Sequence, residues 1–152
     1  MKKIMFIFTL AICLLCAPMT GFAAPTEKEK QQYEEAISEK WIEALKGSIA
    51  LDQGSAVNKT YLLNWMLAAN KPEEAKKIVT QIEALEKEQE KKQESLDPYL
   101  KAKKTCDEKC NADGANAALD NIIRIQKDRL KAQEELTKLW KQVAEYISGK
   151  SK

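Results

Sequence analysis

The sequence predicts an all-α protein: a helical bundle built on a long antiparallel two-helix hairpin, with two shorter helices packed at its base. Charged residues make up 32% of the 152 residues and aromatic residues only 7%, which is typical of Lys/Glu-rich helical proteins. Apolar residues recur every three or four positions over most of the chain, as they do on one face of a helix. Residues that commonly start and stop helices separate these stretches.

The first 23 residues have the three parts of a secretory signal peptide: two lysines, a short apolar run and a stretch of small residues that ends at Ala23. We expect cleavage after Ala23, so that residues 24–152 form a single mature domain. A lipid anchor on Cys16 is the alternative, but Leu15 stands where a lipid-attachment signal requires a small residue. The apolar run is too short to span a bilayer, so we predict a periplasmic protein without stable membrane insertion.

The composition excludes several classes of function. The chain has no histidine, which excludes Ser-His-Asp and Cys-His catalysis and every histidine-ligated metal or haem. Its net charge of +2 comes from Lys2 and Lys3 in the leader, so the mature chain lacks the basic surface of a nucleic-acid-binding protein. The sequence has no glycine-rich phosphate loop. We therefore expect no enzyme, no catalytic residue, no cofactor and no metal site.

Two short helices are predicted to open the mature chain. Thr26 and Glu29 form a capping box, and apolar residues at helical spacing continue a helix to about residue 46. Gly47 is interpreted as the end of that helix, and the cluster Asp52-Gln53-Gly54 as a turn. A second, more apolar helix follows to about residue 69.

The next two helices are predicted to be long, at about 33 residues each. The third begins at Pro72, which suits the first position of a helix, and ends between Lys104 and Cys110. Asp97-Pro98 interrupts this helix and should kink or restart it. The fourth begins after Asp113, its predicted N-cap, and continues almost to the C-terminus. Because a short turn joins them, the two long helices should lie antiparallel.

Pairing the two long helices about their turn predicts an apolar base and a polar middle. The base pairs Ala75, Ile78 and Ile82 with Val143, Trp140 and Leu136, and Trp41 and Trp65 are assigned to the same cluster. In the middle, residues 86–95 are all Glu, Lys, Gln or Ser. Gln89 and Lys92 there face Leu130 and Gln126, which suits solvent or a polar seam.

Cys106 and Cys110 are the two cysteines of the predicted mature chain, in a compartment where disulfides persist. At positions i and i+4 of a helix, Cα atoms lie about 6 Å apart, which is within the range of a disulfide. We therefore expect a structural disulfide. Two alternatives remain: a redox pair, although the spacing is not that of a thioredoxin-like motif, and a copper site, although no histidine or methionine lies nearby.

The predicted function is protein–protein interaction, as in a chaperone, adaptor, inhibitor or immunity-type protein. Because two short helices cover only the base, the far third of the hairpin should form a bare two-helix arm. We expect a partly exposed apolar patch there, made of Leu96, Tyr99, Leu100, Ile122 and Ile123, that binds another protein or a second copy of the chain. The competing prediction is a small-ligand or metal carrier that uses the bundle interior or the Cys-x3-Cys turn.

Overall fold

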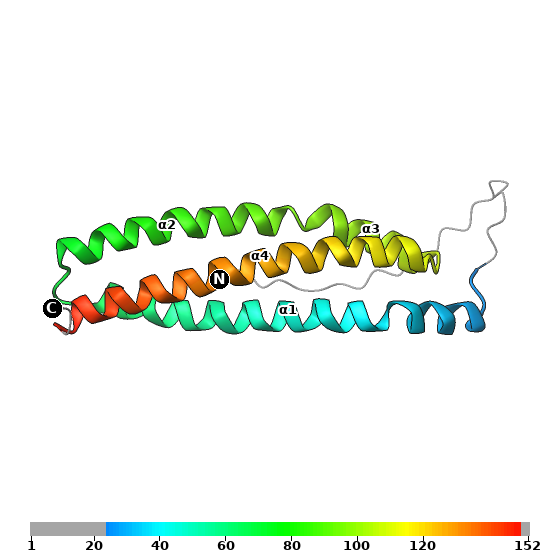
Figure 1. Ribbon diagram of the computed structural model, residues 1–152, viewed down its shortest axis with the longest axis horizontal. Helices are drawn as coiled ribbons and strands as arrows, with labels where there is room; N and C mark the ends of the chain where they lie inside the picture. Colours follow the sequence, from blue (N-terminus) through cyan, green and yellow to red (C-terminus); the bar gives the residue numbers. More distant parts are fainter. Residues whose placement is uncertain (1–23, 150–152) are drawn as a thin grey trace, which may run out of the picture.

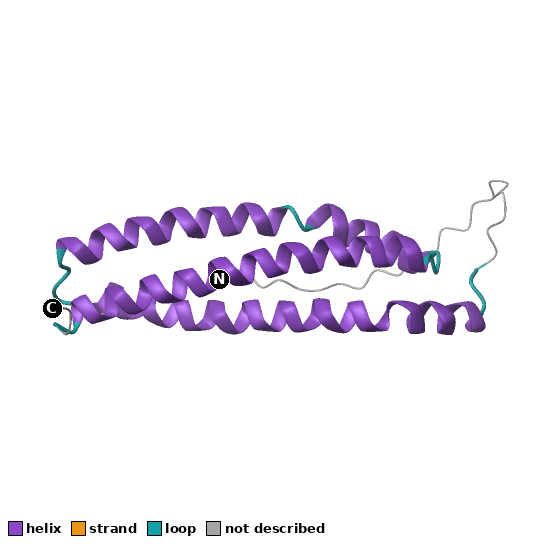
Figure 2. Cartoon of the chain, in the orientation of Figure 1, coloured by secondary structure: helices purple, strands orange, loops and turns teal. Residues whose placement is uncertain are grey.

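The computed structural model describes residues 24–149, which form four helices joined by short turns (Figure 1). They are α1 (Glu27–Leu67), α2 (Glu73–Glu94), α3 (Asp97–Glu108) and α4 (Ala112–Ile147). The described part of the chain contains only helices and loops (Figure 2), so the predicted all-α class is confirmed. The predicted signal peptide, residues 1–23, lies outside the described residues.

All the other helices pack against α4. α1 runs parallel to it on one side, and α2 and α3 run antiparallel to it on the other side (Figure 1). Two hydrogen bonds show the parallel register: Asn116 Nδ2 donates to the Ala36 carbonyl at 3.2 Å, and the Thr137 hydroxyl donates to Asn58 Oδ1 at 2.9 Å. α1 makes few direct contacts with α2 and α3, so α4 joins the two sides of the bundle.

The two short helices predicted first are in fact one continuous helix, α1, of 41 residues. It begins as predicted, at the capping box. Thr26 Oγ1 accepts from the Glu29 N–H at 3.3 Å, and the Glu29 carboxylate accepts from the Thr26 N–H at 2.7 Å. The helix then passes through Gly47 and residues 52–54 without interruption. α1 therefore runs along the length of the bundle and is not confined to its base (Figure 1).

Gly47 and Gly54 allow α1 to lie close to α4. A Cβ atom at position 47 would lie 2.6 Å from Gln126 Oε1, and one at position 54 would lie 2.6 Å from Gln133 Cγ. The two glycines and the two glutamines are each seven residues apart, so the same close contact repeats after two helical turns. Each glycine costs about 1 kcal/mol in helix propensity. The close packing of the two helices offsets that cost.

The remaining helix boundaries lie near those predicted. The helical segment is interrupted just before Asp97-Pro98, between the end of α2 and the start of α3. The proline occupies the first turn of α3, where its missing N–H is tolerated. α3 ends at Glu108, within the predicted limits. At the start of α4 the prediction is wrong, since Asn111 is the N-cap and its side chain accepts from the N–H three residues on. Asp113 lies in the first turn, where a negative charge is favourable.

Two apolar clusters hold the helices together. The distal core, at the end where α3 turns into α4, contains Tyr33, Ile37, Ala44, Leu96, Ala115, Leu119, Ile122, Ile123 and Ile125. The basal core, at the opposite end, contains Ala75, Ile82, Leu136, Trp140 and Val143, with Ile78 at its edge. Between the two cores the buried side chains are mostly polar, and include Asn58, Gln89 and Gln126.

The prediction for one of the tryptophans is wrong. Trp65 packs at the edge of the basal core as expected, but Trp41 does not. The Trp41 side chain is 40% exposed and lies beside α3, where Lys103 Nζ is 4.3 Å from the ring centroid. The prediction assumed a short first helix at the base, whereas the continuous α1 carries Trp41 into the distal half of the bundle.

Candidate functional site

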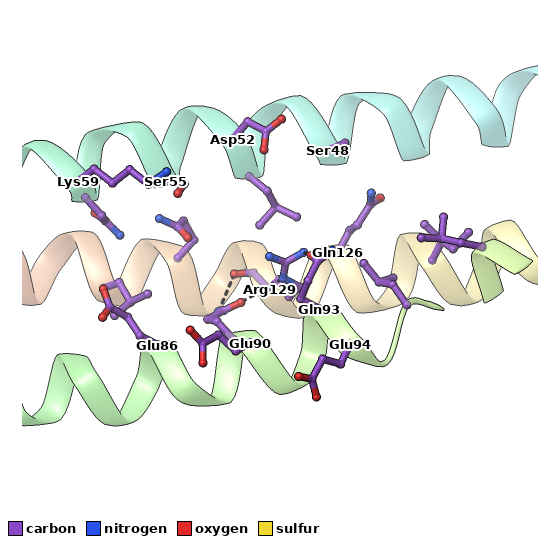
Figure 3. Close-up of a pocket in the computed structure, with 18 of the residues that line it drawn as sticks. Ser48, Asp52, Ser55, Lys59, Glu86, Glu90, Gln93, Glu94, Gln126 and Arg129 are labelled. Atoms are coloured by element: carbon purple, nitrogen blue, oxygen red, sulfur yellow. Dashed lines mark hydrogen bonds between the residues drawn. The ribbon is translucent and has the colours of Figure 1, made fainter. Parts of the chain in front are cut away.

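A long groove runs between α1 and α2–α3, with α4 as its floor. Because α1 and α2 both pack on α4 but scarcely touch each other, their facing sides stay apart. The resulting cavity has a volume of about 750 Å³ and is open to solvent. Figure 3 looks into it, with side chains from α1 and from α2 on either side of α4.

The floor of the groove has the spacing of a coiled-coil seam. α4 contributes Ile122, Gln126, Arg129, Gln133 and Leu136, which follow one another at alternating steps of four and three residues. The first and last of these side chains are apolar and the central three are polar. The floor is therefore apolar and buried at both ends, with polar side chains in the middle.

Arg129 is the central polar group of the floor. Its Nε donates to Gln89 Oε1 at 3.4 Å, its guanidinium also donates to Gln93 Oε1, and Gln89 Nε2 donates to the Arg129 carbonyl at 3.1 Å (Figure 3). Burial lowers the pKa of the Arg129 guanidinium, while the negative charge of Asp52 on α1 acts in the opposite direction. Arg129 thus ties α2 to α4 and places a positive charge in the groove.

α2 lines one wall of the groove with carboxylates. Glu86, Glu90 and Glu94 are spaced four residues apart, which places them on one side of the helix. Asp52 and Lys59 lie on the opposite wall, on α1 (Figure 3). Burial raises the pKa of the Glu86 carboxyl, and the charges of neighbouring glutamates raise it further. With four carboxylates and two cations among its lining residues, the groove favours a positively charged ligand.

Two buried amide side chains in the groove are incompletely bonded. Asn58 Oδ1 accepts from the Thr137 hydroxyl at 2.9 Å, but Asn58 Nδ2 has no partner within residues 24–149. Gln126 Oε1 also lacks a partner among the described residues. Leaving a buried polar atom unbonded costs stability. Both atoms are buried, and Gln126 Oε1 lies at the close contact between α4 and Gly47 of α1, so this unused hydrogen-bonding capacity lies beneath the surface of the groove.

A second polar cluster joins α1 to α3 at the distal end. Lys103 is only 8% exposed and donates to the Asp107 carboxylate at 2.8 and 3.0 Å, with its ammonium over the Trp41 ring. The Tyr33 hydroxyl donates to the same carboxylate. Burial raises the pKa of the Tyr33 hydroxyl, and the hydrogen bond to Asp107 and its charge add to the effect. This cluster bridges two helices that otherwise contact each other little.

The two cysteines beside this cluster are not joined in the structure. Both Cys106, in the last turn of α3, and Cys110, in the turn that follows, are free thiols. The prediction assumed that both cysteines lie on one helix, but Cys110 follows the end of α3 and has a positive φ of 49°. The structure does not show the expected disulfide.

The predicted apolar patch is largely covered. Leu96, Ile122 and Ile123 are buried in the distal core, and Tyr99 is half-buried against it. Leu100 alone remains well exposed, at 45%. The patch was expected to be exposed because the first helix was predicted to be short, but α1 extends over it.

Sequence reasoning found the polar middle of the bundle through Gln89 and Gln126, but it missed the groove. The groove exists only because α1 is continuous, and glycine and aspartate at positions 52–54 suggested a turn. One signal could have revealed α1: the buried residues Ile37, Ala44, Leu51 and Asn58 follow an unbroken seven-residue spacing through both glycines.

Within residues 24–149, no group of three His, Cys, Asp or Glu side chains is placed to hold a metal ion. No helix in the same range combines the length and apolar character needed to cross a bilayer. When the chain is compared with protein-family models, with curated protein sequences and with solved structures, no match is found.

Proposed function

We propose that the protein is an exported protein-interaction module whose groove receives a basic amphipathic helix of another protein. The open groove carries this proposal. The bundle resembles a four-helix arrangement with one position empty. The three filled positions are α1, α4 and the α2–α3 pair, and the groove lies at the fourth. Export rests on the signal peptide expected in residues 1–23.

The shape of the groove suits a helix of about four turns. The floor from Ile122 to Leu136 is about 21 Å long at a rise of 1.5 Å per residue. A guest helix with apolar residues at steps of three and four would pack them against Leu62 and Leu100 at the rims, which are 38% and 45% exposed. Burial of those contacts would supply most of the binding free energy.

The charges of the groove select a basic guest. Lysine or arginine residues on one flank of the guest would face Glu86, Glu90 and Glu94. Burial already penalises the charged form of Glu86, as its raised pKa indicates. A guest cation next to this carboxylate would reduce that penalty, so the ion pair would favour the complex and weaken at high salt.

The test uses two labelled 18-residue peptides that share an amphipathic Leu pattern and differ only in having Lys or Glu at the polar positions. We expect the Lys peptide to bind the mature protein at least tenfold more tightly than the Glu peptide, measured by fluorescence anisotropy at low salt. Ser55→Trp, which fills the α1 wall of the groove, should abolish this binding.

Thr60→Trp is the matched control, because Thr60 is exposed on the same helix and does not line the groove. It should bind the Lys peptide as the wild type does. Equal affinity for the two peptides, or full binding by Ser55→Trp, would contradict the proposal.

A small-ligand carrier is the second candidate function. The groove volume of about 750 Å³ lies within the range of roughly 300–1,000 Å³ that small-molecule pockets occupy. Native mass spectrometry of protein isolated from the periplasm separates the two candidates. A carrier would retain a small molecule at defined stoichiometry, whereas a helix receptor would not.

A further inference from the structure

α1 has an apolar face that the bundle leaves uncovered. Of the ten large apolar side chains that are exposed in the described residues, nine lie on α1. Most of them belong to one surface, which we call the outer face: Ile42, Leu45, Ile49, Ala56, Leu63 and Met66, with Asp52 and Lys59 among them. Ile49, Leu63 and Met66 are 56%, 53% and 64% exposed.

The outer face has the spacing of a second coiled-coil seam. Ile42, Ile49, Ala56 and Leu63 are seven residues apart, and a second row of four begins three residues later with Leu45. The seam spans 24 residue steps, or about 36 Å at 1.5 Å per residue. The side of α1 that packs on α4, through Ala44 and Leu51, is a different side of the helix. α1 therefore has two apolar seams, of which the bundle covers one.

The charges within the outer face determine what can cover it. Asp52 and Lys59 are its two charged members, and they lie on either side of its centre. If a second α1 lay parallel, Asp52 would meet Asp52 and Lys59 would meet Lys59, and both contacts would be repulsive. If it lay antiparallel, each Asp52 would face Lys59 of the second copy, and both contacts would be attractive.

We propose that a second copy of this chain covers the outer face, with the two α1 helices antiparallel about a two-fold axis near residues 54–56. The same two residues then form two reciprocal Asp52–Lys59 pairs, as an interface with two-fold symmetry requires. The apolar residues of the outer face lie on a different side of α1 from the groove, although Asp52 and Lys59 border both surfaces. The inference does not depend on the guest helix.

The apolar residues fit the same register. In the register that pairs Asp52 with Lys59, Leu45 lies opposite Met66 of the second copy, so large apolar side chains meet at both ends of the seam. The residues flanking the centre of the seam, Ser48, Gln53, Ser55 and Thr60, are uncharged and add no repulsion. Because α4 lies on the other side of each α1, the two bundles stay on opposite sides of the interface.

The experiment measures the mass of the mature protein in solution by light scattering and sedimentation velocity. The wild type should be a dimer at tens of micromolar. Asp52→Lys and Lys59→Asp should each shift the protein toward monomer, with at least a tenfold weaker dimer. The double variant D52K/K59D should restore the dimer, because it recreates both reciprocal pairs with the charges exchanged.

A matched pair of variants separates loss of the interface from loss of folding. Ile49→Lys introduces a charge into the outer face, and Val57→Lys introduces one at an exposed β-branched residue about 80° round the same helix at 100° per residue. Ile49→Lys should give a folded monomer by circular dichroism, while Val57→Lys should remain a dimer.

A monomeric wild type at hundreds of micromolar would overturn the proposal. So would a dimer that survives Ile49→Lys, or a double charge exchange that fails to restore the dimer. The monomeric Ile49→Lys variant should still bind the basic peptide, since Ile49 does not line the groove. Failure of the dimer and failure of the groove can therefore be distinguished.

Discussion

Glu86 shows a conflict between burial and charge, because its side chain is partly buried while its carboxylate carries a negative charge at neutral pH. It lies partly buried on α2, where neighbouring glutamates oppose its negative charge and burial removes water from it. Both effects raise the pKa of its carboxyl above the usual range. An ionised Glu86 therefore destabilises the bundle when the groove is empty. A cationic ligand bound next to this carboxylate would reduce the destabilisation.

This conflict predicts a pH-dependent effect of Glu86→Gln. Because folding raises the pKa of Glu86, the folded state binds its proton more tightly than the unfolded state does. The stability contributed by this group therefore increases as pH falls from neutral through the raised pKa. Glu86→Gln should raise the Tm at pH 7 and give a smaller gain at pH 4, where the carboxyl is already largely protonated in the folded state.

Glu94→Gln is the control for this measurement, since Glu94 is an exposed carboxylate on the same helix and wall. It should change the Tm little at either pH. A Tm that falls at pH 7 in Glu86→Gln would show that the Glu86 charge stabilises the free bundle, contrary to the direction of its pKa shift.

At the scale of helices, local signals predicted starts and stops but could not tell a turn glycine from a packing glycine. The capping box at Thr26 and the break at Asp97-Pro98 depend on residues within a few positions of each other, so sequence patterns identify them. Gly54 differs because its role depends on Gln133, which is 79 residues away in the chain. A local pattern contains no information about that neighbour.

The packing role of Gly54 predicts an effect opposite to helix propensity. Alanine in a helix is normally about 1 kcal/mol more favourable than glycine. At position 54, however, a Cβ atom would lie 2.6 Å from Gln133 Cγ, which cannot move without shifting its side chain. Gly54→Ala should therefore lower the midpoint of urea unfolding, whereas Gln53→Ala, one exposed residue earlier, should leave it unchanged or raise it.

A double-mutant cycle shows whether the contact with Gln133 is the cause. Gln133→Ala removes the side chain that the new Cβ would meet, so Gly54→Ala in that background should become neutral or stabilising. If Gly54→Ala remains equally destabilising without the Gln133 side chain, the loss comes from elsewhere in the α1–α4 contact.

At the scale of the whole molecule, the sequence predicted the composition of the basal core but not the shape of the bundle. Ala75, Ile82, Leu136, Trp140 and Val143 were grouped correctly because helical spacing and a short connecting turn determine that grouping. The groove and the outer face of α1 depend instead on how far α1 extends, and the prediction of two short helices concealed both. Because residues 52–54 were interpreted as a turn, the binding surface was predicted at the tip of the hairpin and not on the side of the bundle.

The two cores are joined by α1 and α4, which run continuously through both halves, and this predicts that the bundle unfolds as one unit. Trp140 is 1% exposed in the basal core, so Trp140→Ala should lower the free energy of unfolding by about 3–5 kcal/mol. If the two halves unfold cooperatively, the free energy of unfolding of the distal core must fall by the same amount, although no residue of that core is altered. Trp41 reports on the distal half, because it lies beside Lys103 on α3.

The measurement uses a Trp65→Phe background, in which Trp140→Ala leaves Trp41 as the single tryptophan. We expect the urea midpoint seen by Trp41 fluorescence to fall together with the midpoint seen by far-UV circular dichroism. Trp41→Ala, at a side chain 40% exposed, should cost distinctly less than Trp140→Ala. A Trp41 midpoint that stays in place while the helical signal falls would mean that the halves unfold separately. The polar middle around Arg129 would then be a boundary between two folding units.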